Sequence, residues 1–338
     1  MFSAIRRVVC SRVYRGVLIL LYHRVAQLRR DPWALSVSPE QFDQHLRVLQ
    51  ERTCPIRLPD IRSHLTVGTS RKPLVALTFD DGYADNMHQA EPLLRVTEIP
   101  ATIFVVTGAL RCNREFWWDE LERIVFEPGL RQAPVQVNVG SEVFAWMAPN
   151  DGKATEPDTW QAWTNDIPTD AHRTYLKLYQ RLVPLMAPER TALLDEMINQ
   201  LALPESPRET HRTLSCAEIT ELARSPVIDI GVHTVTHSNL AKLKRGQQAA
   251  EVSDAKAELE QLAGRRLTLF SYPYGKREHY NSHTIETVRS AGFEYAFLNE
   301  PGIAHESTDP LLMPRVVVPP LNGLEFSAWL THCLVTMA

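Results

Sequence analysis

Cysteine is scarce in this sequence, and its placement argues against two common roles. The five cysteines among 338 residues are widely scattered and form no Cys-x-x-Cys pair; they are Cys10, Cys54, Cys112, Cys216 and Cys333. A disulfide framework or a cysteine zinc knuckle needs cysteines in a regular, paired spacing. The sequence therefore argues against both and fits a reducing compartment.

Basic tracts and long apolar runs are also missing. The 36 Lys and Arg residues are spread out against 40 Asp and Glu residues, so the net charge is −4 and nucleic-acid binding gains no support. The apolar run from Val17 to Tyr22 is far shorter than the roughly 20 residues of a membrane span, and Val8 to Cys10 is too short for a signal peptide. We expect a cytoplasmic protein. Peripheral contact with the inner membrane face stays open through the basic N-terminal residues Arg6, Arg7, Arg12 and Arg15.

The sequence does contain alternating strand and helix patterns, with 44% apolar residues to form a core. Apolar runs of strand length occupy residues 17–22, 74–79, 101–106, 227–231, 267–271, 295–298 and 315–318. Helical patterns occupy residues 39–50, 58–65, 86–98, 215–224, 246–263, 282–291 and 324–335. About seven strands joined by helices predict an α/β protein with a parallel, barrel-like sheet.

The alternation is interrupted between residues 111 and 215. A helix follows Phe116, the segments 135–139 and 142–146 alternate like a hairpin around Gly140-Ser141, and two more helices follow at 169–186 and 188–203. We therefore expect residues 1–110 and 216–338 to form the barrel. Residues 111–215 should form an α+β insertion that packs as a cap.

Two carboxylates and a glycine follow the second predicted strand. The run from Leu74 to Phe79 ends in Asp80-Asp81-Gly82, so both acids should sit where a buried strand emerges at its C-terminal end. That end is where α/β barrels carry their chemistry. By themselves the acids fit a turn equally well, with one Asp capping the next helix.

Two histidines, His233 and His237, follow the fourth predicted core strand. If this segment turns helically, residues four apart face the same side, as metal ligands often do. A lone His-x-x-x-His is weak evidence in a chain with 12 histidines, and a solvated or core pair is the alternative. Its place at the same rim as Asp80-Asp81 favours a metal site in which two imidazoles and one carboxylate leave positions open for water and substrate.

The next strand ends in Phe270-Ser271-Tyr272-Pro273-Tyr274-Gly275. This segment fits a turn with aromatic packing. It fits equally well a sugar-sized pocket shaped by Tyr272, Pro273 and Tyr274.

These three motifs, in this order, resemble those of the polysaccharide deacetylase family with the NodB homology domain. The resemblance runs from about Val17 to Val318, apart from the insertion. It implies a distorted seven-stranded (β/α) barrel and metal-dependent hydrolysis of N-acetyl groups on amino sugars. By position, Asp81, His233 and His237 resemble the metal ligands and Asp80 the general base. Zinc is the first expectation, and manganese, cobalt, nickel or iron would fit the same ligands.

The sequence departs from the family pattern at the general acid. Most members carry this acid as a histidine in a Leu-x-His motif near the C-terminal end of the domain, and residues 313–318 contain none. Leu21-Tyr22-His23 reads like that motif moved to the N-terminus, which resembles certain deacetylases of biofilm polysaccharides with a circularly permuted barrel. We therefore nominate His23 as the general acid. The alternative is a buried histidine at a strand end.

A second departure concerns the partner of the base. Many relatives carry an arginine where this chain has Ser271. Arg315, at the start of the last strand, could supply the missing charge from the other side and keep Asp80 ionised near neutral pH.

The leading interpretation is a metal-dependent carbohydrate N-deacetylase that acts on an N-acetylated amino sugar in a bacterial polysaccharide or its lipid- or nucleotide-linked precursor. The alternatives are a deformylase of a formamido sugar, a non-catalytic carbohydrate-binding protein, and a hydrolase of a cyclic ureide or other non-sugar amide. Trp117, Trp118 and Trp146 in the insertion favour a sugar, weakly, since such residues are more often core. The expected partner is the sugar or glycan precursor, and the sequence predicts no oligomeric state.

Overall fold

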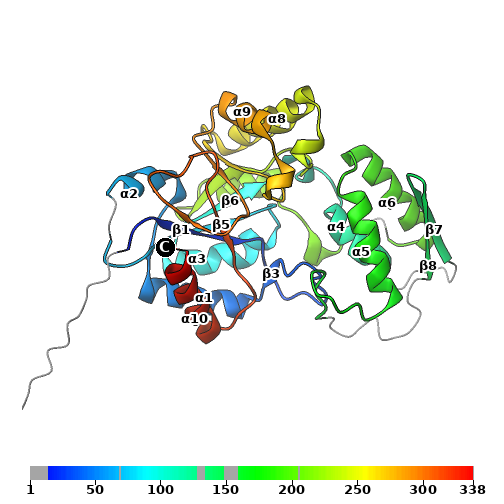
Figure 1. Ribbon diagram of the computed structural model, residues 1–338, viewed down its shortest axis with the longest axis horizontal. Helices are drawn as coiled ribbons and strands as arrows, with labels where there is room; N and C mark the ends of the chain where they lie inside the picture. Colours follow the sequence, from blue (N-terminus) through cyan, green and yellow to red (C-terminus); the bar gives the residue numbers. More distant parts are fainter. Residues whose placement is uncertain (1–13, 68–69, 128–133, 148–158, 205, 338) are drawn as a thin grey trace, which may run out of the picture.

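A curled, mostly parallel sheet forms the main body of the protein (Figure 1). The computed structural model describes residues 14–67, 70–127, 134–147, 159–204 and 206–337. In that part of the chain the sheet order is β11-β10-β9-β6-β5-β1, with β13 also paired to β1 and every one of these pairings parallel. The strands are β1 (Val17–Tyr22), β5 (Leu74–Phe79), β6 (Ala101–Val105), β9 (Ile228–Val232), β10 (Leu269–Ser271), β11 (Tyr295–Phe297) and β13 (Val316–Val317).

The segment around β13 curls the sheet toward closure. Met313 forms a parallel bridge with Phe297 of β11, and Val318 N–H donates to Leu21 of β1, so this segment joins the two sides of the sheet. Two short strands add to the sheet: β12 (Ile303–Ala304) lies antiparallel to β1, and β4 (Cys54–Pro55) lies parallel to the start of β5. The predicted α/β class and distorted barrel are confirmed.

Helices pack around this sheet. They are α1 (Pro39–Arg52), α2 (Ile61–Val67), α3 (Glu91–Thr97), α7 (Cys216–Leu222), α8 (Arg245–Ala263), α9 (Ser282–Ser290) and α10 (Gly323–Thr336). Their starts follow from the sequence: Ser38 and Asn322 accept backbone N–H bonds as N-caps, and Pro39 occupies the first turn of α1. The helix predicted at 86–98 opens instead with a π-helical turn, Asn86–Ala90, before α3.

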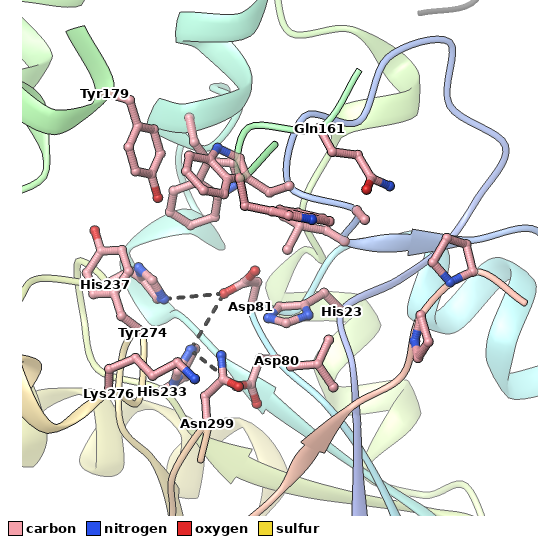
Figure 2. Close-up of a pocket in the computed structure, with 18 of the residues that line it drawn as sticks. His23, Asp80, Asp81, Gln161, Tyr179, His233, His237, Tyr274, Lys276 and Asn299 are labelled. Atoms are coloured by element: carbon pink, nitrogen blue, oxygen red, sulfur yellow. Dashed lines mark ion pairs between the residues drawn. The ribbon is translucent and has the colours of Figure 1, made fainter. Parts of the chain in front are cut away.

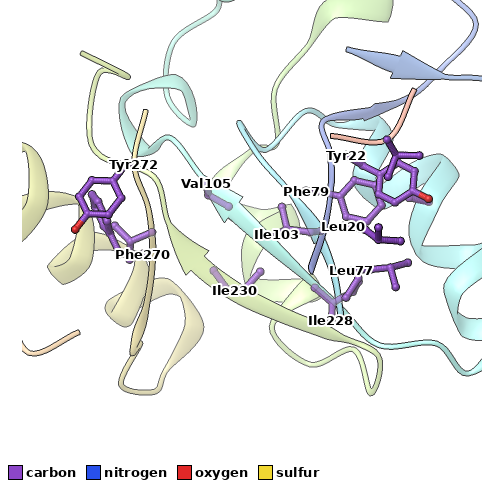
Figure 3. Close-up of a cluster of buried hydrophobic side chains, with 14 of the residues drawn as sticks. Leu20, Tyr22, Leu77, Phe79, Ile103, Val105, Ile228, Ile230, Phe270 and Tyr272 are labelled. Atoms are coloured by element: carbon purple, nitrogen blue, oxygen red, sulfur yellow. The ribbon is translucent and has the colours of Figure 1, made fainter. Parts of the chain in front are cut away.

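Each strand separates two apolar layers, as its period of two requires. Leu18, Leu20 and Tyr22 pack with the helices, whereas Val17 and Ile19 face the inside of the barrel. Figure 3 shows the first layer, where Leu77 and Phe79 of β5 join Ile103, Val105, Ile228 and Ile230 from the neighbouring strands. The same alternation decides which side chains reach the mouth of the barrel.

A second lobe, hereafter the cap lobe, stands beside the barrel (Figure 1). It comprises α4 (Trp117–Phe126), α5 (Asp170–Leu182), α6 (Ala187–Leu201) and the hairpin of β7 (Pro134–Val139) and β8 (Glu142–Met147). Buried Val135, Val137 and Val139 alternate with exposed residues along β7, and they pack in a core that is separate from the barrel's. These elements lie within the predicted insertion 111–215.

Polar contacts fasten the cap lobe to the barrel. Arg30, which belongs to the barrel part of the chain, donates to Glu122 of α4 at 2.8 Å, and the two side chains are only 8% and 5% exposed. The loop between β2 (Arg24–Val25) and β3 (Ser36–Val37) also reaches the lobe, since Trp33 Nε1 donates to the Tyr175 hydroxyl at 2.8 Å. Removing one member of such a buried ion pair typically costs about 3–5 kcal/mol, because the other charge is left without a partner.

The cysteine and N-terminal predictions are partly covered by the described residues. Within these, Cys54, Cys112, Cys216 and Cys333 are free thiols. Cys10, Arg6, Arg7 and Arg12 lie outside the described residues. Across the described ranges, none of the helices has the length and apolar character that crossing a membrane requires.

Candidate active site

Strand alternation brings four polar side chains to one mouth of the barrel. The inward-facing positions of β1, β5 and β9 continue to the first residue after each strand, His23, Asp80 and His233, and those of β10 end at its last residue, Ser271. All four strands are parallel, so these ends lie at the same edge of the sheet. Residues that lie far apart in the sequence therefore come together at this mouth of the barrel.

Three more site residues, Asp81, His237 and Tyr274, have left-handed backbone conformations, with φ values of 74°, 51° and 61°. Thr234, in the loop between the two histidines, has a φ of 68°. Such conformations cost a non-glycine residue on the order of 1–3 kcal/mol, and they concentrate at functional sites. The helical turn that the sequence analysis considered for residues 233–237 is not formed: the segment is not helical, and His237 N–H donates to Thr234 Oγ1 within a left-handed turn. The two histidines still converge.

Glu251 of α8 holds the loop that carries His237. Its carboxylate accepts the backbone N–H groups of Val235 at 3.0 Å and Thr236 at 2.8 Å, and the Thr236 hydroxyl at 2.6 Å. The sequence motifs gave no signal for this role, because the contact spans 16 residues and depends on where α8 packs.

Asp81, His233 and His237 form one cluster of candidate ligands (Figure 2). Asp81 Oδ1 lies 3.6 Å from His233 Nε2 and 3.5 Å from His237 Nε2, and the three ligand atoms all lie within 4.8 Å of one another. All three residues are buried. The structure thus brings together the three residues that the sequence predicted as metal ligands.

The donor set fits a divalent cation. His233 Nδ1 lies 2.8 Å from the Ser271 carbonyl, so this nitrogen carries the proton and Nε2 keeps its lone pair toward Asp81. His237 Nδ1 is buried and has no hydrogen-bond partner among the described residues. Burial lowers the pKa of His237 to about 3, which leaves a neutral imidazole, the form that binds metals. Two nitrogens and one carboxylate oxygen are the set found in catalytic zinc sites.

Asp80 is held by a fork of hydrogen bonds from Arg315. Arg315 Nη1 donates to Oδ1 at 2.8 Å and Nη2 to Oδ2 at 2.6 Å, and the Ser271 hydroxyl donates to Oδ2 at 3.0 Å. Burial by itself would raise the pKa of Asp80, but the charge and hydrogen bonds of Arg315 outweigh it and hold that pKa well below the usual range. Asp80 is therefore an ionised carboxylate at neutral pH.

His23 lies beside the two aspartates. It lines the same cavity as Asp80 and Asp81, and Figure 2 shows its imidazole on the opposite side of Asp81 from His237. The Asn86 side chain anchors the His23 backbone by donating to its carbonyl at 2.9 Å. This placement sets a third titratable group near the aspartates, outside the ligand cluster.

An aromatic cavity of about 720 Å³ opens over these groups. Trp118 and Tyr274 contribute rings on two sides of His237, with ring centroids 5.0 Å and 4.7 Å away. Of the three residues predicted to shape the pocket, Tyr274 lines it, whereas Tyr272 and Pro273 are not among the described residues that do. Tyr272 is buried in the layer between sheet and helices, and its hydroxyl donates to the Leu311 carbonyl.

Several lining residues had no sequence signal. Trp118 was anticipated only as part of an aromatic group in the insertion, and its companions Trp117 and Trp146 belong to the cap-lobe core. The cavity also receives Trp33, Gln161, Trp163, Tyr179, Lys276, Asn299 and Trp329. These residues come from loops, from the cap lobe and, for Trp329, from α10, so their convergence depends on tertiary packing rather than on a local motif.

Comparison with known proteins places these features in a family. Residues 67–129 and 203–296 match the family model described as polysaccharide deacetylase, and residues 130–202 of the cap region lie between the two matched parts. The Bacillus subtilis protein YxkH, provisionally named a polysaccharide deacetylase, is 22% identical over 316 residues, which cover 92% of this chain and 75% of YxkH.

Solved structures support the same fold. The Streptococcus pyogenes deacetylase PplD, in complex with acetate, aligns with a TM-score of 0.58 at 17% identity, over 95% of this chain and 99% of PplD. IcaB from Ammonifex degensii aligns with a TM-score of 0.56 at 19% identity, over 93% of this chain and 97% of IcaB. At these identities the likeness establishes the fold alone.

Proposed function

Given that the chain belongs to the polysaccharide deacetylase family, we propose that it is a metal-dependent hydrolase that removes the acetyl group from an N-acetylated amino sugar in a polysaccharide or its precursor. Family membership supports hydrolytic deacetylation of a polysaccharide in general terms. The observation that carries the finer proposal is an ionised Asp80 beside the Asp81, His233 and His237 cluster, on the wall of an aromatic cavity.

Asp81, His233 and His237 would hold the divalent cation, with zinc as the first choice for this donor set. When bound, the cation supplies Lewis-acid polarisation of the acetamide carbonyl. The protein's own contribution is to fix the ligands: Ser271 sets the tautomer of His233, and Glu251 shapes the loop of His237.

Asp80 acts as the general base. A carboxylate offers about four acceptor positions, and Arg315 and Ser271 fill three of them, which leaves one for the attacking water. Asp80 takes a proton from this water while the oxygen forms its bond to the acetamide carbon. Because Arg315 fixes both carboxylate oxygens, the base is oriented before the substrate arrives.

His23 acts as the general acid. Hydrolysis breaks the bond between the carbonyl carbon and the sugar nitrogen, and the departing nitrogen needs a proton to leave as an amine. His23 faces the cavity and stands outside the ligand cluster, so its imidazole is available to deliver this proton.

The backbone N–H of Tyr274 completes the site as a donor to the developing oxyanion. Within the described residues this N–H makes no hydrogen bond, although it lies in a tight left-handed turn. The neighbouring Gly275 carbonyl accepts from Asn299 N–H at 3.0 Å, which fixes the turn in place.

Acetate release from N-acetylated amino sugars tests the proposed function. Purified protein loaded with zinc should release acetate, and chelation should abolish release until metal is restored. Asp80→Asn should abolish turnover while metal binding persists, and Glu51→Gln, at an exposed acid on α1, should behave as wild type. A formamido sugar assayed in parallel for formate separates deacetylation from deformylation.

Two outcomes would contradict the proposal. Sugar binding without release of acetate, with any of the metals that fit the ligands, would favour a carbohydrate-binding protein. Equal activity in metal-free and metal-loaded protein would exclude the assigned role of the ligand cluster.

A further inference from the structure

A short turn of the cap lobe is built to present two side chains to the cavity. Hydrogen bonds from three residues fix the chain between Trp160 and Asp166. Trp160 Nε1 donates to Asp166 O at 2.8 Å, and Ala162 N donates to Pro32 O at 2.7 Å. Thr164 N and Oγ1 donate to Gln161 O at 3.0 and 2.8 Å. Trp160 and Ala162 are buried in the cap-lobe core. Gln161 and Trp163, which alternate with these two residues along the chain, line the cavity instead.

Trp163 is unusual among the tryptophans of the protein. Its side chain is 56% exposed, and it belongs to none of the apolar clusters formed by the described residues. A large aromatic ring left in water on a rigid turn carries an unfavourable hydration cost that a ligand covering it would remove. The exposed ring is thus already organised for stacking.

Gln161, two residues before Trp163, adds a polar side chain to the same part of the cavity. Among the described residues no hydrogen bond engages its side-chain amide, which offers two donors and an acceptor. Figure 2 shows Gln161 on the cap-lobe side of the cavity, beyond Asp81 and His23 and away from Asn299 and Lys276. A flat aromatic face beside an uncommitted amide matches a sugar ring, which has an apolar C–H face and hydroxyl edges.

We propose that Gln161 and Trp163 form a subsite for the sugar residue next to the one that is deacetylated, so that the substrate is an oligosaccharide chain and not a single amino sugar. This inference rests on the proposed function. The cavity of about 720 Å³ lies in the upper part of the usual range for ligand sites, about 300–1,000 Å³, which leaves room beyond a single acetamido sugar.

The test is the dependence of acetate release on chain length. Wild type should show a kcat/KM that rises from N-acetylglucosamine to its β-linked dimer and longer oligomers. Trp163→Ala should remove this rise through KM, with a loss on the order of tenfold on the oligomers and a clearly smaller loss on the monosaccharide. Trp163→Phe should retain most of the rise. Val143→Ala, an equally exposed apolar residue of the cap-lobe hairpin, is the control and should match wild type.

The outcomes separate this inference from the proposed function. An equal loss at every length, or no loss at any length in Trp163→Ala, overturns the subsite, as does a wild-type rate that does not rise with length. Absence of acetate release from all of these sugars counts against the proposed function. In that case calorimetric binding of the same oligomers decides the subsite: binding that Trp163→Ala loses supports it, and binding that is absent or unchanged overturns it.

Discussion

Arg315 shows how one buried side chain organises the site at the scale of a residue. Its guanidinium is 0% exposed, and besides Asp80 it donates to Leu298 O at 2.9 Å, Thr78 Oγ1 at 3.2 Å and Ser271 Oγ at 2.8 Å. Thr78 lies in β5, Ser271 lies in β10 and Leu298 follows β11, so the guanidinium joins three parts of the sheet around Asp80. A buried guanidinium stabilises the site only while all of its hydrogen-bond acceptors are present, because an N–H group or a charge left without a partner would destabilise it.

We predict that Arg315→Met shifts the acidic limb of the kcat/KM profile to higher pH. Catalysis needs ionised Asp80, so activity is lost as pH falls through the pKa of Asp80, which Arg315 holds below the ordinary value of about 3.9. Without the guanidinium, burial raises that pKa, and activity at neutral pH should fall by about 100-fold because the base is also misplaced. The stability that the pair contributes is present above pH 4 and is lost as pH falls toward the lowered pKa.

Two further variants make this test decisive. Arg315→Lys keeps the charge without the fork and should keep the acidic limb nearer to its original position while kcat falls. Arg47→Met removes an exposed arginine of a surface ion pair and should change neither quantity. An unchanged acidic limb in folded Arg315→Met would exclude its role as partner of the base.

We predict that His23→Ala slows amide hydrolysis by about 10²–10⁴-fold, the usual contribution of a general acid. The loss should depend on the leaving group: nitrophenyl acetate releases a stable phenolate that needs no proton, so its hydrolysis should fall far less. Metal content should stay at the wild-type level, because His23 stands outside the ligand cluster. Amide hydrolysis within a few fold of wild type would show that another group supplies the proton.

The sequence predicted a site residue correctly where the alternation of side chains along a strand decides its direction, and it failed where a turn decides it. Motifs located Asp80, Asp81, His233 and His237 because apolar strands end beside them. The sequence analysis predicted that Tyr272 lines the pocket. Because Tyr272 is two residues after Phe270, its side chain points to the same side of the sheet, and both pack in the layer between sheet and helices. Tyr274 would face the same side by simple alternation, but the left-handed conformation of its own backbone directs its side chain into the cavity. Such a turn at a tyrosine has no signature in a single sequence.

At the scale of elements, α8 supports the loop that carries His237, the second histidine of the candidate metal site. Its Glu251 binds the loop that follows β9 through two backbone N–H groups and a hydroxyl, as described above. The helix itself was predicted almost to the residue, with observed bounds of Arg245–Ala263. Its function as a scaffold was not predictable, because the helix pattern shows which face is apolar but not which polar side chain meets a loop.

We predict that Glu251→Gln lowers metal affinity by about 10–100-fold, the usual effect of losing an outer-shell partner. The amide nitrogen of Gln would face N–H groups that need an acceptor, so the loop carrying His237 should loosen. Asp254→Asn, an exposed acid on the same helix, is the matched control. The measurement is zinc affinity by competition with a chelating dye; an unchanged affinity in a folded variant would assign Glu251 to loop stability alone.

At the scale of the whole molecule, the cap lobe packs directly onto the candidate metal site. Arg190 of α6 stacks over Trp117 at 4.7 Å, Trp117 contacts Trp118 at 5.7 Å, and Trp118 contacts His237 at 5.0 Å. We propose that residues 111–215 form the insertion expected from the sequence, with the cavity between it and the barrel. The pattern of hairpin and helices predicted its elements, but docking onto the barrel depends on side-chain complementarity that no periodicity encodes.

This contact predicts that metal binding stabilises both lobes together. Because His237 lies between Trp118 of the cap lobe and Tyr274 of the barrel, ordering it should tighten both, and zinc at about 100 times its Kd should add about 2.7 kcal/mol of stability. The thermal unfolding midpoint of wild type should rise with zinc in a single transition and should return to its metal-free value with a chelator.

Asp81→Asn should abolish the rise in the midpoint, since it removes a candidate ligand. Asp80→Asn should start from a lower stability, because Arg315 loses its partner, yet keep the shift. A shift that survives in Asp81→Asn would mean that zinc binds elsewhere, and a shift confined to one of two separate transitions would show that the lobes respond independently.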